Sequence, residues 1–324
     1  MTIITETPRL ITVFGASGFI GRHVVRALAK RGYRVRAAVR RPDLALHLQP
    51  LGGVGQIMAI QANLRYRWSV ERAVEGADYV INLVGILSQS GRQRFASVQD
   101  FGARAVAESA RAAGLPLTHV SAIGADLNSP SNYARTKARG EKAVFETLPD
   151  SVVFRPSIVF GPEDKFFNRF AALARISPFL PLIGGGTTKL QPVYVDDVAE
   201  AVARSVDGDV ARGRVYELGG PQVFTFRQCM EEMLPVIGRK RLLLSVPFSV
   251  ASMQAAVLGL LPNAPLTSDQ VKLLRSDNVV SGEAESEGRT LPGLGIVPET
   301  MAAILPSYLW RYRPAGQFTR TFAA

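Results

Sequence analysis

The stretch "TVFGASGFIGRHVVRALAKRGYRVRAAVRR", residues 12–41, decides the fold class. It places Gly15, Gly18 and Gly21 between an apolar run and a segment of helical period, and a second apolar run follows. Glycines at such a junction let the chain turn tightly and bring backbone N–H groups against a pyrophosphate. The stretch therefore predicts the first βαβ unit of a dinucleotide-binding domain, although glycines could also serve only a turn and a helix–strand contact.

Outward from this unit, apolar runs bounded by Gly, Pro or Asp alternate with segments of helical period. Strands are predicted at 10–14, 33–39, 56–61, 78–85, 115–122 and 151–160, and helices around 19–31, 67–75, 97–113 and 132–147. This alternation predicts an α/β fold, a Rossmann-type doubly wound parallel sheet with a smaller C-terminal α/β subdomain. We expect the nucleotide-binding domain at 1–160, its sheet completed by parts of 161–220, and the smaller subdomain at 161–324.

The end of the second predicted strand carries Arg40 and Arg41 where an acidic residue would bond the adenosine ribose of NAD. A guanidinium binds a 2′-phosphate through charge-assisted hydrogen bonds, whereas a carboxylate would repel it. The inferred cofactor is therefore NADP(H), and we expect its reduced form, NADPH. The alternative is that both arginines belong to a solvated basic face. That face would also contain Arg22, Arg26, Lys30, Arg31, Arg34 and Arg36.

The composition limits the functional classes. With 324 residues, 47% of them hydrophobic, the chain can bury a full core. Its formal charge of +11 favours anionic partners such as nucleotide phosphate, lipid head groups or an acidic protein. The single Cys229 excludes an internal disulfide, and His23, His47 and His119 lie too far apart to resemble a metal motif. We expect no metal and no nucleic acid.

The N-terminal sequence "MTIITETPRL" has neither a basic start followed by an apolar run nor an Arg- and Ser-rich, acid-poor character. A mitochondrial precursor would need a presequence. The sequence therefore predicts a bacterial protein on the cytoplasmic side of the inner membrane.

A second motif, "SNYARTKARGEK", contains Tyr133 and Lys137 at a spacing that puts both on one helix face. A tyrosine hydroxyl transfers protons near neutral pH when an adjacent ammonium stabilises its phenolate. Lysine can also hold ribose hydroxyls. With eight tyrosines in the chain the pair alone is weak evidence, but its position after a glycine-rich first loop strengthens it.

Further motifs carry a resemblance. They are "GASGFIG", "INLVGI" (81–86), "HVSAIGA" (119–125), "YARTK" (133–137), "FRPSIVFGPED" (154–164) and "QPVYVDDVAEAV" (191–202). In this order they resemble the extended and atypical short-chain dehydrogenase/reductases over residues 8–220. Within that superfamily, "LGGVGQI", "VFGPEDKFFNRFA", "LPLIGGGTTKLQPVYVDDVA" and a C-terminal "LGIVPETM" and "LPSYLWRYR" are similar to the alpha-subcomplex subunit nine family, a nucleotide-binding accessory subunit of respiratory complex I.

The resemblance extends to about residue 313 and implies a tightly held NADPH that takes no part in electron transfer, with other complex I subunits as partners. It also implies the cofactor contacts. These are Gly15, Ser17, Gly18, Phe19, Ile20, Gly21, Arg40, Arg41, Asn63, Leu64, Leu83, Val84, Gly85, Ser121, Tyr133, Lys137, Pro156, Ser157 and Ile158.

Departures from active relatives imply that no residue is catalytic and that Tyr133 and Lys137 are vestigial. Ala122 stands where active members place a Ser or Thr that polarises the substrate carbonyl, and alanine cannot donate to an oxyanion. Gln99 replaces a usual Asn, and Asn63 a common Asp. If the alignment shifts by one residue, Ser121 restores the catalytic hydroxyl.

The C-terminal half holds a long uncharged stretch, 242–268, that begins at the cations Arg239, Lys240 and Arg241. Proline at 247 and 262 leaves only 248–261 as uninterrupted helix. At ~1.5 Å per residue this is too short for roughly 30 Å of hydrocarbon. The stretch predicts either a peripheral anchor on an anionic membrane surface or the core of the smaller subdomain. Thr267 or Ser268 is predicted to cap the next helix.

Three functions remain open from the sequence. The first is a structural and assembly subunit of complex I, stabilised by bound NADPH. The second is an NADPH-dependent reductase or epimerase acting on a sugar or isoprenoid-like substrate. The third is a regulator that senses the NADP redox state. Ala122, the cation-bounded uncharged stretch and the family-like C-terminus favour the first.

Overall fold

The computed structural model describes residues 8–258 and 266–314 of the 324-residue chain. The chain forms two compact units, each described by itself. Unit 1 contains the residues up to Arg155 together with Val198–Glu217. Unit 2 contains Pro156–Asp197 and the residues from Leu218 onward.

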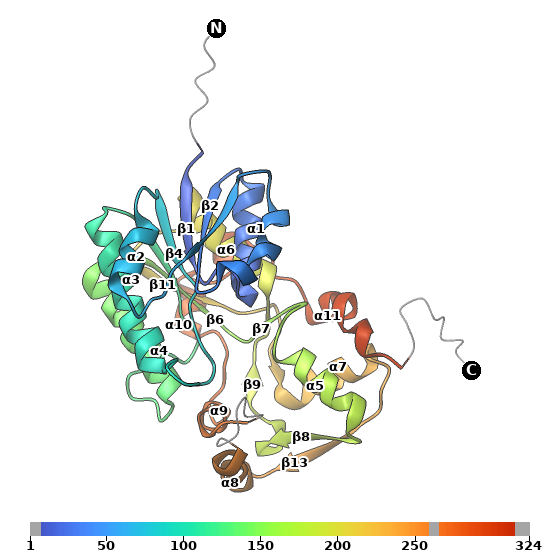
Figure 1. Ribbon diagram of the computed structural model, residues 1–324. Helices are drawn as coiled ribbons and strands as arrows, with labels where there is room; N and C mark the ends of the chain where they lie inside the picture. Colours follow the sequence, from blue (N-terminus) through green and yellow to red (C-terminus); the bar gives the residue numbers. More distant parts are fainter. Residues whose placement is uncertain (1–7, 259–265, 315–324) are drawn as a thin grey trace. The chain divides into compact units, whose positions relative to one another are not determined.

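Unit 1 is built on a seven-stranded sheet whose strand order is β11-β6-β5-β4-β1-β2-β3 (Figure 1). The pairs from β6 to β3 are all parallel. The strands are β1 (Leu10–Phe14), β2 (Arg34–Val39), β3 (Ile57–Gln61), β4 (Tyr79–Asn82), β5 (Leu117–Val120), β6 (Val152–Pro156) and β11 (Arg214–Leu218). The predicted doubly wound α/β fold is confirmed, and the last predicted strand divides into β6 and a separate β7 (Val159–Phe160).

Helices cover both faces of this sheet (Figure 1). One face carries α1 (Phe19–Lys30) and α6 (Val195–Asp207), and the other α2 (Arg67–Val74), α3 (Phe101–Ala112) and α4 (Asn132–Thr147). Three short turns complete the unit: η1 (Pro42–Leu44), η2 (Leu46–Leu51) and the π-helical η3 (Ala96–Asp100). Helix α1 buries one apolar stripe, including Val24, Val25 and Leu28. Helix α4 begins where the Ser131 side chain accepts a hydrogen bond from the Ala134 N–H.

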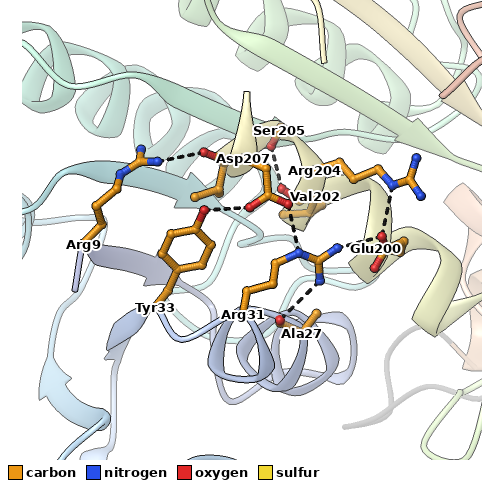
Figure 2. Close-up of polar contacts among 10 residues, drawn as sticks. Arg9, Ala27, Arg31, Tyr33, Glu200, Val202, Arg204, Ser205 and Asp207 are labelled. Carbon is orange, nitrogen blue, oxygen red and sulfur yellow. Dashed lines mark hydrogen bonds and ion pairs between the residues drawn. The ribbon is translucent and has the colours of Figure 1, made fainter. Parts of the chain in front are cut away.

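Helix α6 is held to the start of unit 1 by a polar network (Figure 2). Arg31 donates to Asp207 Oδ2 at 2.9 Å and to Glu200 Oε1 at 2.7 Å. Tyr33 donates its hydroxyl to Asp207 Oδ1 at 2.6 Å. These bonds join residues 169 to 176 positions apart, so they attach a late helix to the first βαβ unit.

Unit 2 has its own apolar core, in which Phe160, Phe167, Met230 and Leu305 are fully buried or nearly so. Three two-stranded ladders, β10–β7, β12–β9 and β13–β8, lie around it. Its other strands are β8 (Phe179–Ile183), β9 (Lys189–Leu190), β10 (Val193–Tyr194), β12 (Phe224–Thr225) and β13 (Leu242–Val246). Its helices and turns are α5 (Phe167–Ile176), η4 (Gly184–Gly186), α7 (Phe226–Val236), α8 (Phe248–Leu258), α9 (Ser268–Leu273), α10 (Gly282–Ser286), η5 (Pro292–Leu294), α11 (Met301–Leu309) and η6 (Trp310–Tyr312).

Two of the family-like motifs meet inside unit 2. The Tyr308 hydroxyl of "LPSYLWRYR" donates to Asp164 Oδ2 of "VFGPED" at 2.6 Å. Asp164 also accepts backbone N–H bonds from Gly161, Phe166 and Asn168. Burial raises the pKa of the Asp164 carboxyl, which these bonds partly offset. This carboxylate therefore ties α11 to the loop before α5.

The described part of the uncharged stretch 242–268 includes a strand, β13, and a helix, α8. In β13 the Leu242 side chain is 63% exposed, whereas Ala251 and Ala255 on α8 are buried against the rest of unit 2. Across the described residues, no helix combines the length and apolarity needed to cross a membrane. Thr267 caps α9, as predicted, and residues 259–265 lie outside the described part of the chain.

Candidate nucleotide-binding site

The glycine loop closes tightly at the carboxyl end of β1. Gly15 has a φ of +82°, and its N–H donates to the Ala38 carbonyl at 3.2 Å. The Gly18 N–H donates back to the Gly15 carbonyl at 3.0 Å. A Cβ on Gly21 would lie 2.2 Å from the Gly15 oxygen, so no side chain fits there. The turn therefore requires glycine at positions 15 and 21, and a Cβ on Gly18 would lie 3.2 Å from the Gly15 oxygen.

The turn leaves the first N–H groups of α1 available. Gly18 is the N-cap and offers no side-chain bond, and the first turn holds no acidic residue. The first helical bond that we observe runs from the Arg22 N–H to the Gly18 carbonyl. The N–H groups of Phe19, Ile20 and Gly21 precede it, and half-buried Ser17 adjoins them. A helix N-terminus of this kind fits a pyrophosphate.

Arg40 and Arg41 are exposed at the end of β2. Arg41 pairs with Asp43, with its Nη2 2.6 Å from Oδ2, and this bond lowers the pKa of the Asp43 carboxyl. Arg40 forms no ion pair with any residue in the described ranges. Two members of the proposed solvated basic face have structural partners instead, because Arg31 pairs with acids of α6 and Arg36 donates to carbonyls near the end of α2.

The loops after β3 and β4 lie at the same carboxyl edge. Asn63 turns its Oδ1 back to the N–H of Arg65, and Leu64 is buried beside α3. After β4 come Leu83, Val84 and Gly85, and the Val84 N–H donates to Asn82 Oδ1 at 3.1 Å. A Cβ on Gly85 would lie 3.2 Å from Lys137 Nζ. The β4 loop therefore reaches the start of α4.

Lys137 is the central charge of this edge. Its ammonium is buried and donates to the Val120 carbonyl at 3.0 Å. Burial lowers its pKa to about 8, an effect that Glu141 one turn later partly offsets. The Glu141 carboxylate is itself bound by Arg155, whose Nη2 lies 2.6 Å from Oε2. A buried ammonium without a carboxylate bond of its own suits hydroxyl or phosphate oxygens of a ligand.

Two neutral groups beside Lys137 have no hydrogen-bond partner among the described residues. They are the Ser121 hydroxyl and both ring nitrogens of His119, all buried. Burial, with the Lys137 charge, lowers the pKa of His119 to about 3, so its ring is neutral. Ala122 is half-buried next to Ser121, and Tyr133 stacks edge-on against Phe95 with ring centroids 5.9 Å apart.

Gln99, predicted as a substitution for Asn, fixes the β4 loop. Its Nε2 donates to the Ile86 carbonyl at 2.9 Å, and its Oε1 accepts from the Thr136 hydroxyl at 2.8 Å. Gln99 therefore connects that loop to α4, next to Lys137.

The remaining predicted contacts, Pro156, Ser157 and Ile158, belong to unit 2. There the Ser157 hydroxyl lies 2.7 Å from Asn278 Oδ1, and the Ile158 carbonyl accepts from the Val193 N–H. The structure thus gathers the predicted residues of unit 1 at one sheet edge and gives Ser157 a partner of its own. The cofactor role of all these residues stays a prediction.

Sequence reasoning missed His119, Glu141 and Arg155. The signal for Glu141 was present, because it follows Lys137 by four residues on one helix. Arg155 comes from β6, and nothing local in the sequence pairs it with Glu141. His119 was considered as a metal ligand and as the first residue of the motif "HVSAIGA", but not as a group beside Lys137.

Comparison with known proteins agrees with this geometry. The model of the NAD dependent epimerase/dehydratase family matches residues 11–219. The NADH dehydrogenase [ubiquinone] 1 alpha subcomplex subunit 9, mitochondrial, of Arabidopsis thaliana is 36% identical, covering 94% of this chain and 78% of that protein. The chain belongs to the subunit 9 family. The resemblance inferred from the sequence is confirmed.

One other relative and one solved structure of the same fold are informative. A ceramide reductase of Caulobacter vibrioides is 33% identical, covering 75% of each chain. The NADPH-dependent quinone oxidoreductase QOR2 of Escherichia coli, solved with NADPH, matches at a TM-score of 0.70 and 22% identity, covering 90% of this chain and 97% of that one. The family whose model matches is described as NAD dependent, and two structural neighbours were solved with NADPH and with NAD.

The predicted location is wrong. The subunit 9 relatives are mitochondrial proteins, not proteins of a bacterial inner membrane. The prediction rested on the composition of the first ten residues, which says nothing of where the relatives function.

Proposed function

We propose that this chain is an accessory subunit of NADH:ubiquinone oxidoreductase, respiratory complex I, that holds NADPH without turning it over. The observation that carries the proposal is its likeness to subunit 9 along 94% of its length, including the C-terminal part that the epimerase model does not match. The bond between Asp164 and Tyr308 shows that this C-terminal part packs into unit 2.

The unit 1 geometry supports a retained cofactor. The closed glycine loop fits a pyrophosphate, Arg40 and Arg41 suit a 2′-phosphate, and buried Lys137 suits ribose hydroxyls. Ala122 supplies no donor for a developing oxyanion, and the loss of one such donor costs about 100-fold to 1,000-fold in rate. Binding without efficient chemistry follows from this combination.

The test is association with the enzyme. Native membranes are solubilised mildly, and the chain should co-migrate with NADH:quinone oxidoreductase activity and carry NADPH in near-stoichiometric amount. A chain that migrates alone in every preparation would refute the subunit assignment.

An NADPH-dependent reductase or epimerase is the second candidate. The unbonded Ser121 hydroxyl, the intact Tyr133–Lys137 pair and the relative named ceramide reductase favour it. We predict that purified protein does not oxidise NADPH with carbonyl substrates, ceramide precursors included, at more than ~1 s⁻¹. The variant Ser121→Ala should then oxidise NADPH no faster and no slower than the unmodified protein. Faster turnover that Ser121→Ala abolishes would establish the reductase.

We also propose that residues 239–268 dock unit 2 on an anionic membrane surface as a peripheral contact. Lys240 is exposed at the start of β13, followed by Leu242 and Leu244, which are 63% and 47% exposed. Phe179, 43% exposed, lies opposite Leu242 on β8. The buried side of α8 fits the alternative prediction that this stretch forms the core of the smaller subdomain. The membrane-surface and core predictions therefore apply to different faces of the stretch.

A further inference from the structure

Strand β3 leaves one edge of the unit 1 sheet unpaired. Within residues 8–258 and 266–314, it is the last strand in the sheet order and pairs only with β2. The Val35 N–H of β2 donates to the Gln56 carbonyl at 2.8 Å, which fixes the direction in which each β3 residue points its backbone. The alternate residues Ile57, Ala59 and Gln61 therefore point their N–H and C=O groups away from the sheet.

No backbone group of another described residue bonds to these outward N–H and C=O groups. Native sheets usually protect such an edge with charged side chains, proline or a bulge. The strand "IMAIQ" contains no charge and no proline, and its ladder with β2 is regular. From Leu44 to Leu64 the chain has no Asp, Glu, Lys or Arg. The edge is therefore open to another strand.

Apolar and basic side chains accompany the open edge. Met58 is 54% exposed and stands in register with Arg36 of β2. Leu44 and Leu46, in the turns η1 and η2 that lie against β3, are 65% and 62% exposed. These side chains offer an incoming strand contacts beyond its backbone bonds.

The charged residues around this edge are mostly positive. Residues 31–72 contain eight arginines and only two acidic residues, Asp43 and Glu71. Exposed Arg34 of β2, near the amino end of the edge, forms no ion pair with a described residue. Acidic side chains on the incoming strand would complement this charge.

We propose that the free edge of β3 binds an extended, acidic segment of a partner protein, which adds to the unit 1 sheet as an eighth strand. The outward amides supply the hydrogen bonds, Met58 an apolar contact and Arg34 the charge preference. The proposal rests on the proposed function only in that the partner belongs to the same complex.

A proline substitution in β3 can distinguish backbone pairing with an incoming strand from side-chain contacts. Ala59→Pro removes an outward N–H and no bond to β2, so the fold should persist. Ala59→Thr is the matched control, because it keeps the N–H. The probe is a capped eight-residue peptide of alternating Glu and Val, compared with its Lys and Val counterpart at low salt. Circular dichroism and thermal unfolding verify the fold of each variant.

The unmodified chain and Ala59→Thr should bind the acidic peptide alike, and the basic peptide at least tenfold more weakly. Ala59→Pro should lose tenfold or more, and Arg34→Glu should weaken acidic-peptide binding while its affinity for the basic peptide rises. No binding by the unmodified chain, or equal binding by a folded Ala59→Pro, would overturn the proposal.

Hydrogen exchange in the assembled enzyme gives an independent reading. The amides of Ile57, Ala59 and Gln61 should exchange in the isolated chain and be protected in purified complex. If the chain co-migrates with the enzyme and these amides stay unprotected, the edge proposal is wrong and the subunit assignment stands. If the chain never co-migrates with the enzyme, the subunit assignment fails. The peptide experiment then decides whether the β3 edge binds an acidic strand.

Discussion

A single buried lysine organises the candidate site at the scale of residues. Lys137 donates to a backbone carbonyl, while the nearest carboxylate of its own helix, Glu141, is bound by Arg155. His119 stays neutral because burial and this ammonium both disfavour a second positive charge. Such an arrangement keeps Lys137 available to a ligand, and it makes folding sensitive to acid.

The first residue-scale prediction concerns that sensitivity. Folding depresses the pKa of His119 from 6.5 to about 3, so its contribution to stability is complete above pH 6.5 and is lost as the pH falls toward 3. At pH 5 the unfolded chain binds the extra proton, which costs about 2 kcal/mol of unfolding free energy. Lys137 is protonated in both states there, so it contributes no pH dependence.

Urea unfolding between pH 7 and pH 5 measures this effect. The variant His119→Gln should be less dependent on pH across that range, and the control His47→Gln, at an exposed position, should behave like the unmodified chain. An unchanged pH dependence in His119→Gln would show that other groups cause the acid sensitivity.

The second residue-scale prediction concerns cofactor choice. Arg40→Asp should weaken NADPH roughly 10- to 100-fold while changing NADH affinity little, because the 2′-phosphate loses a charge-assisted hydrogen bond. Asp43→Asn should strengthen NADPH binding, since it frees Arg41 from its present partner. Titration of both nucleotides measures the ratio, and equal affinities in the unmodified protein would exclude this role for the arginines.

At the scale of elements, the close approach of α4 to η3 supports the site. A Cβ on Gly140 would lie 2.2 Å from the Gln99 carbonyl oxygen, and that oxygen belongs to backbone, which cannot simply rotate away. Gln99 in turn holds the β4 loop through Ile86. The packing of two helical segments thus determines where the β4 loop lies, which is predicted to contact the cofactor.

The element-scale prediction follows from this contact. Gly140→Ala should gain a little helix propensity but lose about 1–3 kcal/mol to the forced separation of α4 and η3. It should also weaken NADPH binding, because the Gln99 bond to the β4 loop shifts. Gly282→Ala is the control, since nothing lies within 4 Å of its added Cβ. Denaturation and nucleotide titration measure both effects, and an equally stable Gly140→Ala would contradict the steric reading.

The elements of unit 1 up to β6 could be predicted from sequence because local patterns specify them, whereas α6 and β11 were not predicted as elements. Apolar runs bounded by Gly, Pro or Asp located every strand from β1 to β6, and segments of helical period located the helices α1 to α4. Unit 2 could not be predicted in this way, since strands as short as β9 and β12 carry no period. In the candidate site, the spacing of the glycines predicted the glycine loop. The bond between Arg155 and Glu141 could not be predicted, because it depends on how α4 packs on β6.

At the scale of the whole molecule, the chain combines a unit that carries the candidate nucleotide-binding site with a second unit for which we propose membrane docking. The exposed leucines of β13 follow Lys240, whose ammonium forms no ion pair with a described residue. Its neighbours differ, because Arg239 donates to the Tyr312 carbonyl and Arg241 to the Ala174 carbonyl. A test of membrane docking must therefore leave those two arginines in place.

The whole-molecule prediction uses the triple variant Lys240→Glu, Leu242→Ser, Leu244→Ser. A cation near an anionic surface contributes ~1 kcal/mol, and its reversal adds repulsion, so binding to phosphatidylserine-rich vesicles should fall about tenfold or more. The control Lys189→Glu, Val223→Ser, Val297→Ser makes one charge reversal and two apolar-to-serine changes at exposed positions of the same unit outside β13. It should bind like the unmodified chain, and both variants should keep NADPH because unit 1 is untouched. If the two variants sediment with vesicles equally, β13 is not the docking surface, and its exposed leucines must be explained by a protein partner.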